Sequence, residues 1–292
     1  CDTISVLRDS AYVGELSRGQ ATHEKLVEMM TGRVINMDRT GGTRSPGPVR
    51  LAVRGLCSPG KFSDISFDVR AGEIVGVAGL VGAGRSEVAC AIFGLDARAS
   101  GKVLVDDKPL ELGSVTRSIG AGISLVPEDR KRQGLVLSMS VRHNTTLASL
   151  DLISTGPILN LAREECAASD MVTRLGTKTA SIDTPVRQLS GGNQQKVVIG
   201  KWLARSGAVL IIDEPTRGVD IGAKQVIHQL LDRLARQGTA ILMISSELPE
   251  LLASADRILV MREGRLLTDV PSANADEQIL LRLMVGTGGT AA

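Results

Sequence analysis

Residues 73–86 read EIVGVAGLVGAGRS, a short apolar run that leads into a glycine-rich turn. The run predicts a buried strand, and Glu87 to Phe93 after the turn predict a helix. In such a unit, glycines let the backbone N–H groups of the turn face a phosphate, and the helix N-terminus adds its positive end. The same turn also occurs in many α/β folds for packing reasons alone. The stretch predicts an α/β fold and, by itself, leaves phosphate binding open.

The turn matches the phosphate-binding pattern GxxxxGK[ST] at every position except the lysine, where Arg85 stands. Arginine keeps the charge but is longer, planar and forked, so we expect nucleotide binding to survive better than hydrolysis. Ser86 would supply a hydroxyl ligand to Mg²⁺. The expected nucleotide-binding residues are Gly79, Gly82, Ala83, Gly84, Arg85 and Ser86.

A second apolar run, VLIIDE at residues 209–214, ends in two carboxylates. Asp213 is expected to contact Mg²⁺, and Glu214 is expected to act as the catalytic base toward the attacking water. A solvated strand end would explain the two acids equally well, but it would not predict a phosphate loop earlier in the same chain. The two motifs together favour a nucleotide-binding fold.

A third motif, LSGGNQQK at residues 189–196, precedes that strand and opens a helix that continues to Ala204. Here the chain resembles the ABC ATPase family, whose LSGGQ signature offers serine and glycine N–H groups to the γ-phosphate held by a second, facing domain. A Ser-Gly-Gly helix cap would not explain the position of the motif between the other two. The matching signature residues are Leu189, Ser190, Gly191, Gly192, Asn193 and Gln194.

The resemblance runs from about Val49 to Gly286 and implies ATP and Mg²⁺ as ligands. It implies a P-loop NTPase fold with a parallel core sheet, an antiparallel edge sheet from Val49 to Val69, and a helical insertion over roughly 139–185, with one helix at 163–175. Asp220 matches the D-loop, which crosses the dimer interface. Besides Arg85, two positions depart from the family pattern: Glu128 stands where the Q-loop has a glutamine near the metal, and Ser246 takes the place of the switch histidine.

The two ends of the chain repeat each other at a constant offset of 254 residues, which favours duplication. The repeated residues are Asp2, Ile4, Val6, Arg8, Ala21, Leu26, Met30 and Gly32. We therefore expect residues 1–33 to be the end of a preceding ABC domain. Residues 34–48, rich in Gly, Thr, Ser and Pro, are expected to be a linker, residues 49–287 one complete domain, and residues 288–292 a tail.

Three longer stretches, at 126–135, 189–196 and 213–220, together with MISSELPE at 243–250, resemble the monosaccharide importers of the ribose, galactose and xylose type. Their ATPases are tandem duplicates whose second copy commonly has an altered phosphate loop and no switch histidine. The resemblance implies an ATP-driven sugar translocase at the cytoplasmic face of the membrane. Its partners would be the preceding ABC domain, transmembrane permease subunits and, indirectly, an extracytoplasmic sugar-binding protein. This fragment alone would hydrolyse ATP weakly or not at all.

Composition limits the other function classes. With 34 basic and 32 acidic residues and 2% aromatic residues, the chain has neither the charge nor the stacking groups of a nucleic-acid-binding protein. Its four cysteines lack metal-ligand spacing, and His23, His143 and His228 are each expected at the surface. Two alternatives stay open: an ABC protein that acts as a nucleotide-gated clamp outside transport, and a regulatory nucleotide-binding module.

Overall fold

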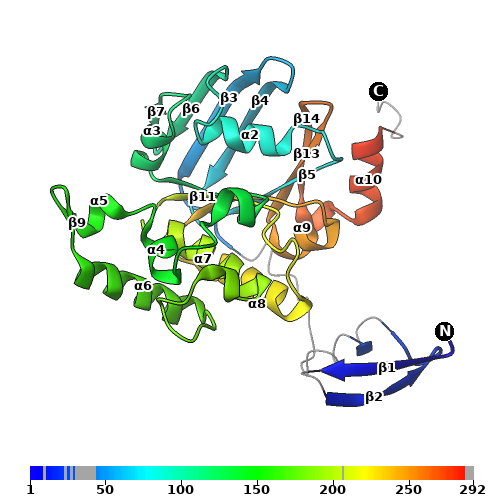
Figure 1. Cartoon of the computed structure of the whole chain (residues 1–292). Coiled ribbons are helices and arrows are strands. Elements are labelled where there is room, and N and C mark those ends of the chain that lie inside the picture. The colour runs from blue at the N-terminus through cyan, green and yellow to red at the C-terminus, as the bar shows by residue number, and fades with distance from the viewer. Residues whose placement is uncertain (9–10, 23–24, 27–28, 30–43, 206, 287–292) are drawn as a thin grey trace.

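The structure is a computed structural model that describes residues 1–8, 11–22, 25–26, 29, 44–205 and 207–286. Figure 1 shows a small N-terminal hairpin apart from a larger body. In the body, a curved antiparallel sheet, a central sheet with helices and a mainly helical lobe follow one another. This is the α/β arrangement that the motifs predict.

The central sheet has the strand order β14-β13-β5-β12-β11-β8, and only β14 runs antiparallel to its neighbour. Every residue of β5, β8, β11 and β12 is buried, as near-continuous apolar runs require in a parallel sheet. The carboxyl ends of β5 and β11 therefore bring the glycine-rich turn and the two acids to the same edge. The strands are β5 Ile74–Gly79, β8 Ile123–Val126, β11 Val209–Asp213, β12 Ala240–Ile244, β13 Arg257–Arg262 and β14 Arg265–Pro271.

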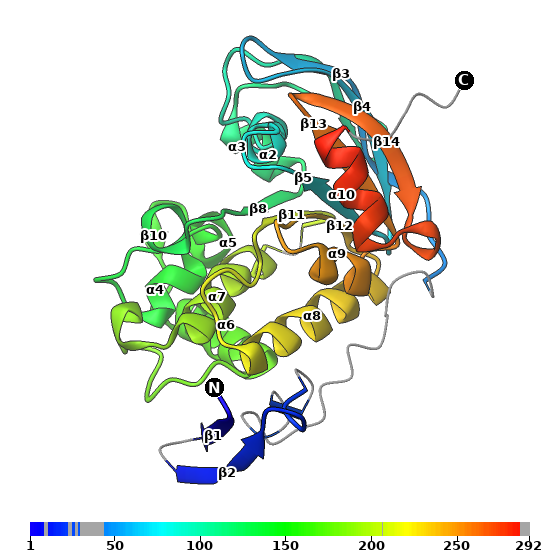
Figure 2. The same cartoon turned by 90° about the vertical axis from the view of Figure 1, so that its right-hand side faces the viewer.

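Helices pack on this sheet, as Figure 2 shows for α8, α9 and α10. In α8 the apolar residues Ile227, Leu230, Leu231 and Leu234 are buried at helical spacing. The helices are α2 Arg85–Ile92, α3 Val115–Gly120, α7 Gly191–Leu203, α8 Ile221–Arg236, α9 Leu248–Ser254 and α10 Glu277–Val285. Within the described residues, no helix has both the length and the apolar character needed to span a membrane.

The antiparallel sheet has the order β4-β3-β6-β7. Its strands are β3 Val49–Ser58, β4 Phe62–Arg70, β6 Ser100–Val105 and β7 Lys108–Leu110. The buried residues Leu51, Val53, Ile65, Phe67 and Val69 point into the core, which explains the alternation in this part of the sequence. The predicted antiparallel edge sheet is therefore confirmed.

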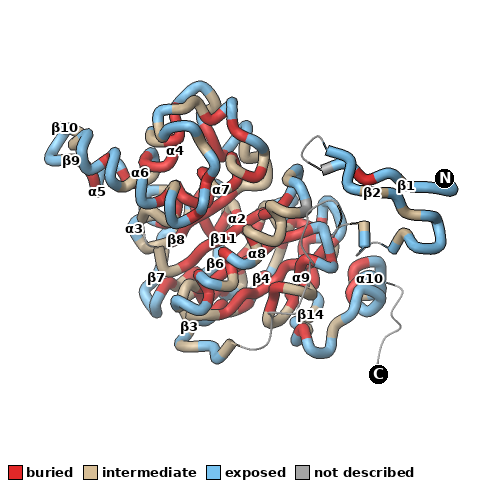
Figure 3. Tube along the Cα trace, turned by 90° about the horizontal axis from the view of Figure 1, so that it is seen from below, coloured by how far each residue is buried: buried red, intermediate tan, exposed pale blue. Residues whose placement is uncertain are grey.

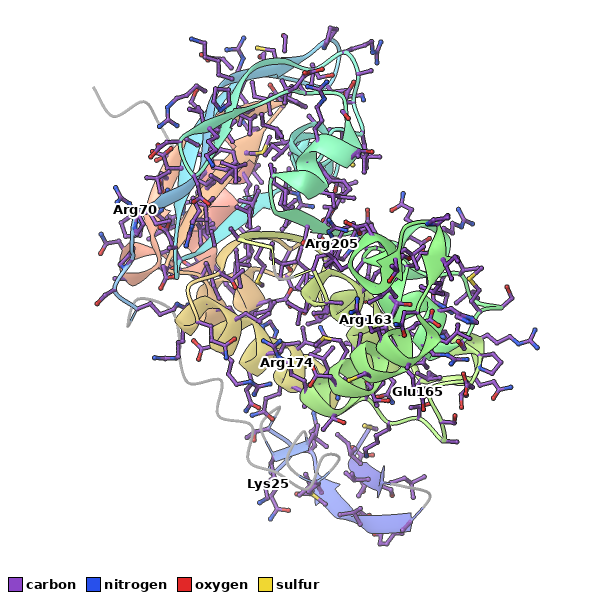
Figure 4. The ribbon with its side chains drawn as sticks, turned by 90° about the vertical axis from the view of Figure 1, so that its left-hand side faces the viewer. Lys25, Arg70, Arg163, Glu165, Arg174 and Arg205 are labelled. Carbon is purple, nitrogen blue, oxygen red and sulfur yellow. The ribbon has the colours of Figure 1, made fainter. Side chains whose placement is uncertain are left out.

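The predicted insertion is mainly helical. It contains α4 Val141–Thr146, α5 Leu150–Ile153 and α6 Leu161–Leu175, and a minimal hairpin, β9 Ser154–Thr155 with β10 Ile158–Leu159, which the sequence did not predict. Figure 3 shows exposed residues along its outer turns and buried ones toward α7. Arg205, just after α7, donates to the carbonyl of Ala148 at 2.7 Å and pairs with Asp151, which fixes the insertion to the body (Figure 4).

The N-terminal hairpin consists of β1 Thr3–Arg8 and β2 Ala11–Ser17. Its six Cα pairs are those of β13 and β14 with 254 subtracted from each number. The match includes the register shift, between Val6 and Leu7 in one hairpin and between Val260 and Met261 in the other. Met30 and Gly32 of the sequence repeat, like His23, lie outside the described residues. The two hairpins thus share a local geometry as well as a sequence pattern.

The end of the expected linker is attached to the body. Arg44, with 3% of its side chain exposed, pairs with Asp232 at 2.7 Å and with Asp256 at 3.2 Å. It also donates to the carbonyl of Ser254. Residues 34–43, and the tail at 288–292, lie outside the described residues. The linker over residues 34–48 stays a prediction, and the structure adds that Arg44 within it is attached to the body.

Candidate nucleotide site

The glycine-rich turn follows β5 and opens α2. A Cβ atom on Gly79 would lie 2.8 Å from the carbonyl oxygen of Met261, so no side chain fits there. Gly84, the residue before α2, has a φ of +91°, a conformation that glycine adopts without strain. Val81 at the tip of the turn is 96% exposed. The turn therefore stands free at the sheet edge, in front of the N-terminus of α2.

Arg85 is turned toward the chain's own acids. Its Nη1 donates to the carbonyl of Ser245 at 2.8 Å, and its Nη2 lies 3.9 Å from Oε1 of Glu214. The Arg85 and Glu214 side chains are each 10% exposed. The guanidinium at the position of the usual lysine therefore already makes contacts within the protein.

Ser86 and Asp213 are brought together, as the motifs predict. Burial raises the pKa of Asp213 to about 6, against a hydrogen bond from Ser86 and the charge of Arg85, which both lower it. Oδ1 of Asp213 is buried without a hydrogen-bond partner. An orphaned carboxylate oxygen beside a hydroxyl fits a divalent cation, because hard cations prefer such oxygen ligands.

Glu214 follows Asp213 in a backbone conformation with a φ of +49°, which is unusual for a side chain of this kind. Its Oε2 accepts a hydrogen bond from the Ser246 hydroxyl at 3.1 Å. Burial raises the Glu214 pKa, while the Ser246 hydrogen bond and the Arg85 charge lower it. Both oxygens of the predicted catalytic base therefore face groups of this chain.

The sequence missed a polar network behind this site, centred on Glu250. Its carboxylate accepts hydrogen bonds from Thr216 at 2.9 Å and from Ser245, and lies 3.1 Å from Nε2 of His228. Burial would raise the Glu250 pKa, but the hydrogen bonds and the charge of His228 bring it below its usual value. The network joins the loops that follow β11 and β12. No local pattern announces it, because its members come from three separate segments.

The expectation for the histidines is half right. His143 is exposed. The expectation is wrong for His228, whose side chain is only 23% exposed and whose Nδ1 lies 2.9 Å from Oγ of Ser254. The apolar face of α8 placed His228 off the core, and only the fold shows that α9 lies across from it.

The signature residues form the N-terminus of α7. Ser190 is the N-cap residue, and its Oγ accepts a hydrogen bond from the side-chain Nδ2 of Asn193 at 2.9 Å. The buried Gln194 donates to the carbonyls of Val186 and Leu189, both at 3.2 Å. Side chains thus shape this turn from within, and the first N–H groups of α7 have no helical partner of their own.

Both signature glycines are required by close packing. A Cβ on Gly191 would lie 2.8 Å from the carbonyl oxygen of Gly218, and one on Gly192 would lie 2.6 Å from Cβ of Ala223. Asp220, the predicted D-loop residue, caps α8 by accepting a hydrogen bond from the Ala223 amide at 2.9 Å. The signature turn and the predicted D-loop therefore lie against each other.

Glu128, expected near the metal, forms an ion pair with Arg217. Across the residues that the structure describes, no three His, Cys, Asp or Glu side chains are grouped so that they could hold a metal ion. A role for Glu128 as a magnesium ligand stays a prediction.

A comparison with known families matches the part of the chain that holds the phosphate turn, the signature turn and the two acids. The family model described as ABC transporter matches residues 62–217, more than half of the chain. The chain belongs to the ABC transporter family. The ABC ATPase domain binds ATP with Mg²⁺ and hydrolyses ATP, and the observed sheets and helices are those of its P-loop fold.

Similar proteins include two ribose import ATP-binding proteins. RbsA of Rhodococcus jostii is 46% identical over 292 residues, which is 100% of this ABC chain and 58% of the relative. RbsA 1 of Streptomyces coelicolor is 46% identical over 98% of this chain and 57% of the relative. The chain thus spans a little over half the length of these curated relatives.

Among solved structures, cbiO1 from Clostridium perfringens, part of the ABC transporter complex cbiONQ, matches with a TM-score of 0.65 and 23% identity. That match covers 82% of this chain and 93% of the other. The ABC cassette MJ0796, in a dimer bound to ADP and Pi, matches with a TM-score of 0.65 and 20% identity, over 76% of this chain and 98% of the other. At these identities the two structures support the ABC fold alone.

Proposed function

We propose that this chain is part of the ATP-binding subunit of an ABC importer for a simple sugar, and that it couples ATP binding and hydrolysis to transport. The proposal of sugar as cargo rests on the 46% identity to ribose import proteins along the whole chain. Transmembrane permease subunits would carry the sugar, and an extracytoplasmic sugar-binding protein would deliver it. The chain would lie peripherally at the cytoplasmic face of the membrane.

Within that subunit, this domain would bind MgATP and hydrolyse it poorly. The observation that carries this proposal is Arg85, whose guanidinium contacts Ser245 and approaches Glu214 instead of pointing freely from the turn. Ser246, in place of a switch histidine, offers Glu214 a hydroxyl that cannot take up a proton near neutral pH. Because Ser246 and Arg85 face the two oxygens of Glu214, the carboxylate is poorly placed to receive a proton from the attacking water.

The chain's own residues would nevertheless hold the nucleotide. Gly79, Gly82, Ala83 and Gly84 would turn backbone N–H groups toward the phosphates, and Arg85 would add a positive charge. Ser86 and Asp213 would hold Mg²⁺, with Glu128 as a further candidate. The metal supplies positive charge that neutralises the β- and γ-phosphate oxygens.

The signature turn would serve a different nucleotide, held by a facing domain. Ser190 and the two glycines stand at the N-terminus of α7, where unpaired N–H groups and the helix dipole favour an anion. ATP would draw the two domains together, and their separation after hydrolysis would move the permease between its two faces.

The facing domain is proposed to precede this one in the same polypeptide. The hairpin β1–β2 repeats the register and the bulge of β13–β14. In the body, β13 pairs in parallel with β5, the strand before the phosphate turn. A preceding cassette would supply the corresponding strand beside β1, so residues 1–33 are assigned to its end.

The deciding experiment measures MgATP affinity and ATP turnover by this chain alone and in the complete protein. We expect saturable binding by this chain with turnover well below about 1 s⁻¹, and ordinary turnover only when the preceding cassette is present. Ordinary turnover by this chain alone would overturn the division of work. Co-purification with permease subunits supports transport, whereas recovery with ribosomes or DNA would overturn it in favour of a clamp.

A further inference from the structure

A short segment after β8 touches both the signature turn at the start of α7 and the predicted D-loop, residues 218–220. We call residues 128–134 the bridging segment. Within it, Arg130–Gly134 form a π-helical turn, capped by Asp129, whose Oδ1 accepts from the amides of Lys131 at 3.0 Å and Arg132 at 3.1 Å. π-helical turns are rare, and those that do occur often lie at functional sites.

Arg130 contacts the D-loop through its guanidinium. Nη1 donates to the carbonyl of Arg217, and Nη2 donates to the carbonyl of Gly218 at 3.0 Å. A forked guanidinium can serve two successive carbonyls at once, which a lysine ammonium cannot do with the same fixed geometry. Gly218 has a φ of +66°, so these two carbonyls belong to a turn that an external donor helps to hold.

The same guanidinium lies against the signature turn. A Cβ on Gly191 would be 2.8 Å from Nη2 of Arg130, as close as it would be to the Gly218 oxygen. Arg130 and Gly218 therefore pack so closely against Gly191 that a methyl group on Gly191 would not fit. Arg130 is the side chain that touches both loops there.

Both ends of the bridging segment are fastened as well. At its start, Glu128 pairs with Arg217, the residue just before the D-loop. At its end, the carbonyl of Gly134 accepts a hydrogen bond at 2.7 Å from the buried Lys201 of α7, the signature helix. A Cβ on Gly134 would lie 3.1 Å from Val198, also of α7. The segment thus spans from the D-loop to the signature helix.

We propose that Arg130 is a positioning residue that holds the D-loop against the signature turn, so that the two loops move as one unit when the nucleotide site closes. This inference rests on the proposed function, because the two joined loops affect ATP turnover only if the signature turn binds the nucleotide of a facing domain. A change at Glu214, just before the D-loop, would then reach the signature turn through contacts of the protein alone.

The first test is hydrogen exchange in the complete protein. Arg130→Met should speed amide exchange about tenfold at two places, as loss of charge-assisted hydrogen bonds predicts. One is Val219 in the D-loop, whose amide donates to the carbonyl of Thr216, and the other is residues 194–196, where the hydrogen-bonded amides of α7 begin. The amide exchange rates of Arg130→Lys should lie closer to those of Arg130→Met than to those of the wild type. A lysine cannot donate to both carbonyls with the same fixed geometry. Arg132→Met is the matched control: its side chain is 88% exposed, and it should leave both segments unchanged.

Two results would overturn the inference. In one, only the D-loop amide of Val219 exchanges faster, and residues 194–196 keep wild-type protection. In the other, β5 and β11 lose protection together with both loops, which would make Arg130 a residue of general stability.

The second test is the kinetics of the complete ATPase. Arg130→Met should lower kcat about fivefold or more while KM for ATP stays within about twofold, since positioning acts on the transition state rather than on binding. An unchanged kcat would overturn the inference. If the wild type hydrolyses ATP but transports no sugar, the proposed function fails, while the exchange result still decides the role of Arg130.

Discussion

The phosphate turn and the signature turn are both glycine-rich, and both open a helix. The polar side chains of the two turns, however, make different contacts. In the phosphate turn, the Arg85 side chain reaches back to Ser245 and toward Glu214. In the signature turn, Gln194 supports the backbone from behind, and Gly191 and Gly192 press against the D-loop side of the body.

The difference is what the proposed division of work between the two turns requires. A loop whose charge is bound internally loses freedom to follow the reacting phosphate. A loop held from behind by its own domain stays rigid and keeps its other side available to a neighbour, which is what pre-organised anion binding needs.

The largest expected effect tests the signature turn. Gly191→Ala should lower ATP turnover by the complete protein at least about a hundredfold, because the new methyl would displace Gly218 or Arg130 from the turn. MgATP binding by this chain should not change. Gly120→Ala is the control, since a Cβ there meets no atom within 4 Å. If both variants retain turnover, the signature of this domain is not used.

A second prediction concerns the interior of α7. Burial lowers the pKa of Lys201 to about 8 from 10.5. Between these pH values the unfolded chain keeps a proton that the folded chain has released, so the free energy of unfolding rises with pH across this window. Below pH 8 the contribution of Lys201 to the free energy of unfolding is constant. The rise should amount to about 3 kcal/mol.

Lys201→Met should abolish this rise in chemical denaturation curves measured at a series of pH values. Lys102→Met, which alters an exposed lysine, should retain it. The same pH profile in the Lys201→Met variant and the wild type would mean that the ammonium is hydrated, and that α7 is less firmly packed than the comparison requires.

The third prediction asks what Arg85 still does for the nucleotide. Arg85→Met should weaken MgATP affinity about tenfold in calorimetric titration, because a charge-assisted contact to phosphate is lost. Arg98→Met, an exposed arginine beyond the far end of α2, should have no effect. A loss of less than about threefold would show that the guanidinium serves only Ser245 and Glu214.

The smallest expected effect tests whether this domain's own site turns over. Glu214→Gln should change the ATPase rate of the complete protein by less than about twofold, because most turnover would occur at the other site. A loss of a hundredfold would break the comparison, since it would make Glu214 a working base despite its contacts with Ser246 and Arg85.

The sequence predicts the features that repeat at a local period. Fully apolar runs predicted β5 and β11, alternation predicted the edge sheet, and the family resemblance implied a helix over most of α6. The contact of Ser86 with Asp213 also followed, because strand ends in a parallel sheet meet at one edge.

Polar contacts between distant segments that belong to no sequence motif could not be predicted. Nothing near Arg130 in the sequence indicates that its guanidinium reaches two carbonyls 87 and 88 residues later. The pairing of His228 with Glu250 depends on how α9 lies across α8, which no helical period contains. Polar contacts of this kind depend on the assembled fold rather than on propensity.

The position of Arg44 has a practical consequence for cutting the chain. A fragment begun at Val49, where the alternating pattern starts, would deprive Asp232 and Asp256 of a guanidinium that is 3% exposed. Loss of such a buried cation leaves carboxylates in a poorly solvated place. Expression boundaries, circular permutants and altered connectors should therefore keep Arg44 with the body and make their changes upstream of it.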